Sequence, residues 1–221
     1  ASIFNIEGLR VKQVNQQLGD TDFGTASFQL PEGNYLLVVV AHSCNGNPTM
    51  TDSDKIQFTN TTGYSDTFLY CKQVAIGEDA VEMQISLDRI VSLCRFVITD
   101  NIPSDVAKMQ FYYTGGSGAF NATTGLGCVN SKQTVTYNVA AGQKQFDLYT
   151  FLHAAEGTIA LKVSALDVND KELYVRDFNI PLSRNQITWF SGSFFSGNNP
   201  QALSASLDIN TAWNGEKRLT Y

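Results

Sequence analysis

Histidine is nearly absent from this chain, and cysteine occurs without the spacing that site chemistry usually needs. The 221 residues include two histidines, and the four cysteines form no Cys-x-x-Cys pair. These two residue types supply most general bases, nucleophiles and zinc ligands, so few arrangements for catalysis or zinc binding remain. We therefore expect no enzymatic activity, no catalytic residue, no cofactor and no metal ion.

Three further absences narrow the class of protein. The longest apolar run extends only from Tyr35 to Ala41, whereas a membrane-spanning helix needs roughly 20 such residues. The sequence contains no long run of Ala, Glu, Lys and Leu of the kind that forms a helix. The formal net charge is −6 and the 15 basic residues are scattered, so the concentrated basic face that binds nucleic acid is missing. We expect no transmembrane segment and no nucleic-acid partner.

The sequence does contain many β-strand patterns, and the most informative one lies in the middle of the chain. From Val81 to Leu87, apolar and polar residues alternate with the two-residue period of a half-buried strand. A near-continuous apolar stretch follows and ends at Ile98. Residues 87–98 also fit a helical stripe, but their β-branched side chains and the lack of a capping residue favour a strand.

Similar patterns recur along the whole chain, separated by turn residues. Tyr35–Ser43 predicts a central strand covered on both faces, and Thr158–Val168 with Glu172–Ile180 predicts a hairpin. We expect the remaining strands over Ser2–Val14, Phe23–Leu30, Ile56–Phe58, Asp66–Val74, Lys108–Thr114, Gln133–Val139, Gln145–Leu152, Gln186–Phe195, Leu203–Ile209 and Glu216–Tyr221, with long loops at 44–63 and 115–132. Short strands at a spacing of roughly 8–12 residues predict an all-β sandwich fold.

A domain boundary is predicted where Asn101 and Pro103 follow the apolar stretch and a new alternating pattern begins. We expect two β-sandwiches in tandem, at residues 1–103 and 104–221. The alternation places these residues in the cores: Leu36, Val38, Val40, Cys94, Ile159, Leu161 and Val163.

Few residues are candidates for chemistry. His42 and Cys44 would share a face at a strand end and could form a Cys–His pair or part of a metal site, although an ordinary strand end is the favoured interpretation. His153 is interpreted as a solvated histidine. Asp52 to Asp54 and Asp167 to Glu172 could offer oxygen ligands to calcium, but lysines beside them favour ordinary turns.

Other short motifs carry little functional information. Gly115–Gly118 lacks the helix and Lys-Ser/Thr of a phosphate loop, so we expect a flexible loop. Asn60 and Asn121 begin glycosylation sequons by pattern alone. Cys44, Cys71, Cys94 and Cys128 could form two disulfides by three connectivities, but we favour free thiols because a chain of this length does not need such cross-links.

Four motifs, in this order, resemble the fimbrillin family, the surface-lipoprotein pilins and accessory subunits of Bacteroidales type V fimbriae. The motifs are Leu30-Pro-Glu-Gly-Asn-Tyr-Leu-Leu-Val-Val38, Leu87-x-Arg89 with Arg95-Phe-Val-Ile98, Arg184-Asn-Gln-Ile-Thr-Trp-Phe-Ser-Gly192, and Trp213-Asn-Gly-Glu216. The resemblance implies two transthyretin-like Greek-key β-sandwich domains in tandem. It also implies export as a lipoprotein to the cell surface or outer membrane, with a leader and lipid anchor upstream of Ala1.

The same resemblance implies a role as a stalk, tip or anchor subunit. Such a subunit would assemble with other fimbrial subunits by β-strand exchange and adhere to host or bacterial surface ligands. The alternation within Leu203–Ile209 makes Leu203, Leu207 and Ile209 the strand-exchange candidates, unless this strand simply completes its own domain.

An alternative function is a glycan-binding surface lipoprotein with aromatic side chains exposed in a groove. The candidate residues for stacking on a sugar are Tyr64, Tyr112, Tyr113, Trp189 and Trp213.

Overall fold

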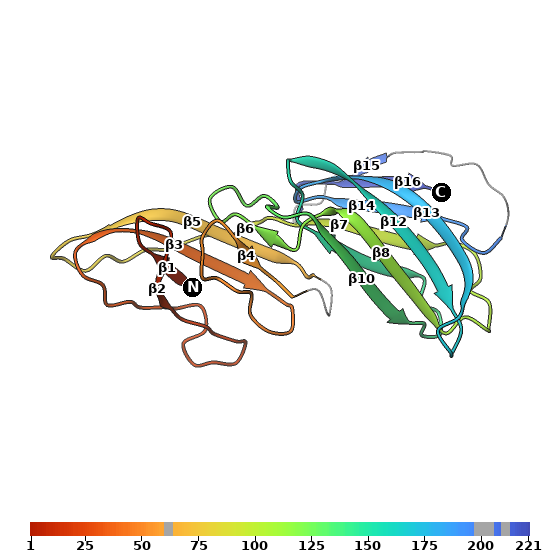
Figure 1. The fold of residues 1–221 in the computed structure, drawn as a ribbon, viewed down its shortest axis with the longest axis horizontal. Coiled ribbons are helices and arrows are strands. Elements are labelled where there is room, and N and C mark those ends of the chain that lie inside the picture. The colour runs from red at the N-terminus through yellow and green to blue at the C-terminus, as the bar shows by residue number, and fades with distance from the viewer. Residues whose placement is uncertain (60–63, 197–205, 209–212) are drawn as a thin grey trace.

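The computed structural model describes residues 1–59, 64–196, 206–208 and 213–221, and these residues form an all-β protein (Figure 1). They fold into antiparallel and mixed sheets in a sandwich-like arrangement, which confirms the predicted tandem β-sandwich class. Within these ranges no helix is present, so none could cross a membrane.

The first sheet has the strand order β2-β1-β3-β5-β6 and is antiparallel throughout. Its strands are β1 (Ser2–Phe4), β2 (Arg10–Gln13), β3 (Gly33–His42), β5 (Thr67–Ile76) and β6 (Asp88–Arg89). One face of this sheet packs against the small ladder of β4 (Ile56–Gln57) and β9 (Ala119–Phe120). Because β9 comes from the second half of the chain, the first core is closed by both halves.

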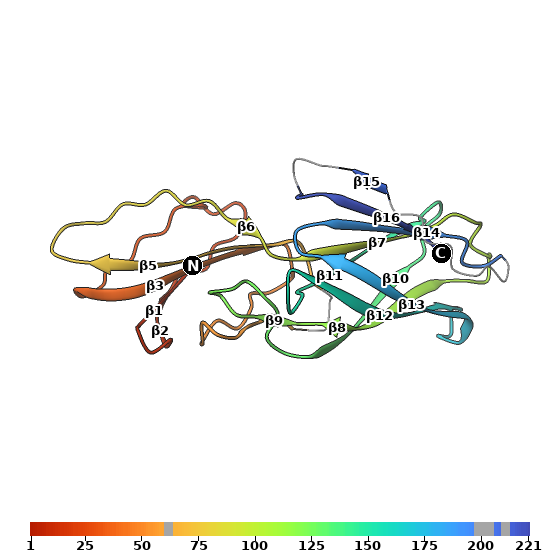
Figure 2. The same ribbon diagram turned by 90° about the horizontal axis from the view of Figure 1, so that it is seen from above.

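Two sheets pack face to face in the second half (Figure 2). One contains β10 (Ser131–Asn138), β8 (Lys108–Gly116), β12 (Glu156–Leu166) and β13 (Glu172–Ser183), in that order. The other contains β11 (Gln145–Thr150), β7 (Ser92–Ile98), β14 (Ile187–Gly192), β16 (Glu216–Thr220) and β15 (Ser206–Asp208). The β14 strand runs parallel to both of its neighbours, β7 and β16.

Phenylalanine side chains hold the two sheets of the second half together. The ring of Phe96 on β7 lies 5.4 Å from Phe111 on β8 and 5.8 Å from Phe178 on β13, measured between centroids. The predicted core residues Val38, Cys94, Ile159, Leu161 and Val163 are all buried, and Leu36 and Val40 pack against the first core while half-buried. The alternation in these strands therefore predicted the buried face correctly.

The segment from Val81 to Leu87 is not the strand that its alternation predicts. It is unpaired, and Val81, Met83 and Ile85 are 48%, 44% and 37% exposed. The hairpin between β5 and β6 closes through only two residue pairs, so this segment has no partner. Alternation indicates which side chains could share a buried face. A strand forms only where the backbone of a neighbouring strand is available for hydrogen bonding.

The predicted strand Phe23–Leu30 is also wrong, because local hydrogen bonds satisfy the backbone in this region. The Gln16 side-chain amide donates to the carbonyl oxygens of Asp22 and Thr25 at 2.8 and 2.7 Å. Side-chain bonds of this kind replace those of a ladder. The predicted first strand Ser2–Val14 is instead the hairpin of β1 and β2, in which the Asn5 carboxamide accepts bonds from the turn.

Two other ambiguous stretches are resolved as strands. Residues 87–98 form β6 and β7 and no helix. The expected loop at Gly115–Gly118 is wrong, because β8 continues to Gly116 and Ser117 bridges to Phe151. Gly115 has φ +90°, and a Cβ there would collide with the Thr158 carbonyl oxygen. Glycine is required here by close strand packing rather than by flexibility.

The division at residues 1–103 and 104–221 stays a prediction, although strand pairings connect the two parts. β7 pairs with β11 and β14 of the second half, and β9 pairs with β4 of the first. In addition, the Asp100 carboxylate accepts hydrogen bonds from the backbone N–H groups of Phe194, Phe195 and Ser196.

Candidate functional site

The Cys–His pair suggested by the sequence does not form a reactive dyad. The ring of His42 packs edge-on against Phe58 at 5.1 Å, and its Nδ1 is buried without a hydrogen-bond partner in the part of the chain described. Burial lowers the pKa of His42. The Cys44 thiol instead lies 3.0 Å from the Ser65 hydroxyl. These residues make up an ordinary strand end, as the sequence favoured.

The acidic stretches form turns. The Asp52 carboxylate accepts the N–H of Asp54 at 2.8 Å, and the Asp167 carboxylate accepts those of Asn169 and Lys171. No group of three or more His, Cys, Asp or Glu residues that could hold a metal ion occurs among the residues described.

The remaining isolated candidates also have structural surroundings. His153 is exposed, with Nδ1 2.9 Å from the Gly127 carbonyl oxygen. All four cysteines are free thiols, as favoured, and complete burial raises the pKa of Cys94 far above its ordinary value. Asn121 donates its amide to Asp54, whereas Asn60 lies outside the described residues.

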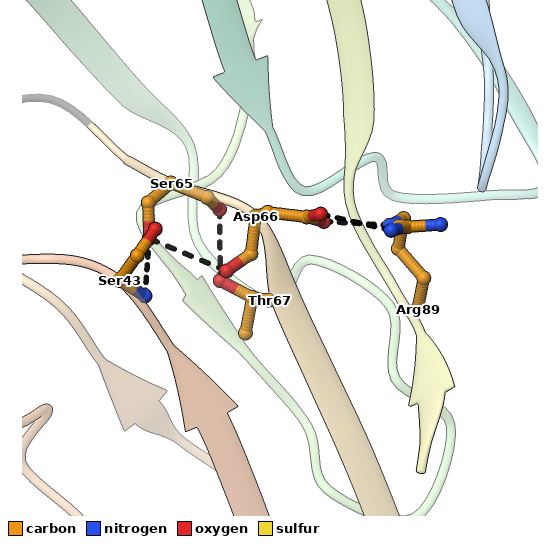
Figure 3. Close-up of polar contacts among 5 residues, drawn as sticks. All are labelled: Ser43, Ser65, Asp66, Thr67 and Arg89. Atoms are coloured by element: carbon orange, nitrogen blue, oxygen red, sulfur yellow. Dashed lines mark hydrogen bonds and ion pairs between the residues drawn. The ribbon is translucent and has the colours of Figure 1, made fainter. Parts of the chain in front are cut away.

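Arg89 makes the most connected polar cluster at the junction between the halves (Figure 3). Its guanidinium binds the Asp66 carboxylate through two hydrogen bonds, of 2.6 and 2.9 Å. The same guanidinium lies 4.5 Å from the ring centroid of Phe68 and 4.0 Å from that of Trp213. Trp213 therefore attaches the chain beyond β15 to the end of the first sheet.

Hydroxyl groups next to Asp66 order the chain that leads into β5. The Ser65 hydroxyl accepts the N–H of Ser43 at 3.1 Å, and the Thr67 hydroxyl donates to the Ser65 carbonyl at 2.9 Å (Figure 3). The dashed contacts in Figure 3 all join residues of this cluster to one another. The cluster can fix the relative position of β3, β5 and β6, and it contains no nucleophile paired with a general base.

A second charged row crosses the outer face of the sheet that contains β7, β14 and β16. Arg95 binds Asp147 through two bonds of 2.8 Å, and Trp189 lies between Arg95 and Arg218 at 4.8 and 4.7 Å. The hydrogen bond to Asp147 raises the pKa of Arg95. Trp189 is paired in register with Arg95 on one side and Arg218 on the other, so each face of its ring meets a guanidinium.

Four of the five aromatic residues proposed for sugar stacking are therefore occupied or covered. Tyr64 and Tyr113 are buried, Trp189 lies between two guanidinium groups, and Trp213 lies on Arg89. Tyr112 alone belongs to the exposed class, at 38%. The structure does not assemble the five residues into an exposed groove.

The strand edges are the remaining functional candidates. β15 lies at the outer edge of its sheet and pairs with β16 through three residues, including Leu207 opposite Lys217. Leu203 and Ile209 lie outside the described residues. In the first sheet, no strand within residues 1–59, 64–196, 206–208 and 213–221 pairs with β5 on its β6 side from Tyr70 to Ile76. The sequence analysis did not identify this second edge, because it predicts a strand at residues 81–87 and names no partner for it.

Three solved structures of Bacteroides proteins are similar to this chain at low sequence identity. A candidate adhesin from Bacteroides ovatus ATCC 8483 is 16% identical, with 69% of this chain covering 66% of that structure at a TM-score of 0.49. A candidate adhesin from Bacteroides thetaiotaomicron VPI-5482 is 15% identical, with 81% of this chain covering 70% of that structure at a TM-score of 0.46.

A candidate cell adhesion protein from Bacteroides ovatus ATCC 8483 is 14% identical, with 80% of this chain covering 66% of that structure at a TM-score of 0.40. The chain thus spans between 66% and 70% of the length of these three structures. No curated protein matches the sequence. The model of a family of unknown function, DUF6562, matches residues 12–220, and the chain belongs to that family.

Proposed function

We propose that this protein is a non-enzymatic structural subunit of a cell-surface fimbria that serves in assembly and adhesion. The observation that carries the proposal is β15, an edge strand that comes from the predicted donor segment and pairs with β16 at all three of its described residues, 206–208. The ordered motifs that resemble fimbrillins support the same function. In this proposal the subunit is exported and is held at the outer membrane by a lipid anchor.

The assembly step needs strands and no catalytic group. A donor strand adds to a partner's sheet edge through main-chain hydrogen bonds, while alternate side chains fill pockets and select the partner. In this proposal Leu203, Leu207 and Ile209 supply the alternate apolar side chains. The partners are other fimbrial subunits, and the adhesion ligands are molecules of host or bacterial surfaces.

The test uses the full chain and a labelled peptide with the sequence of residues 202–210. Removing the chain after Pro200 is unsuitable because β16 and the buried Tyr221 would be lost as well. We expect saturable peptide binding as the peptide displaces the chain's own β15. The control peptide carries Asp in place of Leu207 and Ile209 and should not bind. Equal binding of both peptides, or binding of neither, would refute the donor role.

A further inference from the structure

Among the residues that the structure describes, no strand pairs with the outer edge of β5 from Tyr70 to Ile76, although a matching segment follows in the sequence. β5 and β6 pair at Phe68 with Arg89 and at Leu69 with Asp88. Continuing this register one residue at a time places Val74 opposite Met83 and Ile76 opposite Val81. In the structure, however, the segment after β5 bows out from the sheet on its way back to β6 and does not pair with β5 (Figure 2).

The side chains of this unused pairing are complementary on both faces. On one face, Tyr70, Val74 and Ile76 would meet Leu87, Met83 and Val81. Apolar pairs of this kind stabilise neighbouring strands.

On the other face, small and polar side chains would oppose one another, as with Gln73 and Gln84. Lys72 shares the first face with Tyr70 and would lie opposite Ile85. Glu82 would lie on the other face, opposite Ala75. No like charges would meet, so no charge repulsion opposes strand addition.

Three apolar side chains within residues 81–87 are exposed, so their burial against a partner would be stabilising. Val81, Met83 and Ile85 lie on an extended chain at 48%, 44% and 37% exposure, and they would share one face of a strand. An unpaired edge beside an alternating apolar segment is the usual starting point for edge pairing and domain swapping.

We propose that the β5 edge, Tyr70–Ile76, is a docking site for residues 81–87 of a second copy of this chain. The exchange is reciprocal, so each copy covers the partner's edge, and residues 77–80 form the hinge. The proposed occupant is a second copy because residues 81–87 have the side-chain pattern that fits this edge, yet they do not pair with the β5 edge of their own chain. This contact is independent of the proposed fimbrial function and uses a different strand from β15.

The register predicts a specific disulfide. The Ile90 N–H donates to the Thr67 carbonyl oxygen, which makes that pair a hydrogen-bonded one. Alternate pairs counted from it place Val74 and Met83 at a non-hydrogen-bonded pair, where opposite Cα atoms are about 4.5 Å apart. Cysteines at such a pair meet the distance that a disulfide requires.

The test mixes two single variants, Val74→Cys and Met83→Cys, each with the exposed thiol removed by Cys128→Ser. We expect a covalent dimer that contains one chain of each kind after mild oxidation. Glu82→Cys replaces Met83→Cys in the matched control, and because its side chain would point to the opposite face, dimer yield should fall at least about tenfold. A disulfide that forms only within a chain carrying both Val74→Cys and Met83→Cys would overturn the second copy as occupant. No disulfide in either arrangement would overturn the docking site.

Sedimentation of the unmodified chain gives an independent readout. A concentration-dependent dimer should be abolished by Met83→Asp with Ile85→Asp. Val168→Asp changes an equally apolar residue that is 75% exposed on the other half, and it should leave the dimer intact. A monomer at all concentrations, or equal loss with both sets of variants, would contradict the proposal.

Discussion

At the scale of single residues, Arg89 carries several interactions that no other cation in the first sheet combines among the described residues. Its side chain is 12% exposed, binds Asp66 in a fork and lies against the rings of Phe68 and Trp213. A planar guanidinium can do all of this at once, whereas a lysine ammonium cannot. Arg89 therefore fixes both the start of β5 and the chain that leads into β16.

Replacing Arg89 with Lys should destabilise the protein by about 1–2 kcal/mol, because the fork and the ring contacts are lost while the charge remains. Urea unfolding followed by tryptophan fluorescence measures the change. Lys72→Met, at an exposed cation of the same sheet, should stay within about 0.5 kcal/mol. Equal effects of the two changes would show that the Arg89 cluster contributes nothing specific.

Asp100 should make the stability depend on pH. Burial alone would raise the pKa of this carboxyl, but hydrogen bonds from Phe194, Ser196 and Phe195 outweigh it and lower the pKa below its ordinary value. A lowered folded-state pKa stabilises the protein fully above the unfolded value of about 3.9, and this stabilisation is lost as the pH falls through the folded value.

Asp100→Asn should therefore lower stability at pH 7 and flatten its fall between about pH 5 and pH 2. Thermal melts at a series of pH values measure this. Asp105→Asn, at an exposed position nearby, is the control. A slope for Asp100→Asn identical to that of the unmodified protein would contradict this assignment.

At the scale of elements, the sequence predicts which face of a strand is buried better than it predicts which strand pairs with it. Ile159, Leu161 and Val163 are buried as their alternation indicates, because this face of β12 packs against the sheet that contains β7 and β14. Val81 to Leu87 alternates just as clearly and stays unpaired. Periodicity is a local property, whereas pairing depends on an edge supplied by a distant part of the chain, so the strand edges could not be predicted from the pattern.

Close packing between strands has a sharper test at Gly115. Gly115→Ala adds a Cβ at φ +90° that also collides with the Thr158 carbonyl oxygen, so β8 and β12 must separate. Gly142→Ala adds the same strain at φ +77° with nothing within 4 Å. We expect the Gly142 change to cost about 1–2 kcal/mol and the Gly115 change clearly more, measured by chemical unfolding. Equal costs would mean that the strands do not approach as closely as described.

At the scale of the whole molecule, the pairing of β7 determines where the chain can be cut. β7 lies between β11 and β14, whereas Asn101, Pro103 and the new alternating pattern after them predict a boundary near residue 103. β7 ends at Ile98, five residues before Pro103, and both of its hydrogen-bonded neighbours come from the chain after Pro103. A local sequence pattern is limited in the same way at the candidate site. It identifies the aromatic residues but not the guanidinium groups that pack against them.

A fragment of residues 90–221 should fold with a cooperative thermal transition, and a fragment of residues 104–221 should not, because it lacks a central strand. Circular dichroism of the two fragments measures this. Equal cooperative melts would support the boundary near residue 103 and show that β7 is dispensable.

The most direct test of the proposed assembly asks whether β15 pairs with another copy. Two single variants, Leu207→Cys and Lys217→Cys, each combined with Cys128→Ser, would be mixed and oxidised, since the register places positions 207 and 217 opposite each other. Lys162→Cys in place of Lys217→Cys is the control, because it lies on the other sheet. Strand exchange predicts covalent dimers that contain one chain of each kind and none with the control. A disulfide that forms only when both cysteines are in one chain would contradict the account.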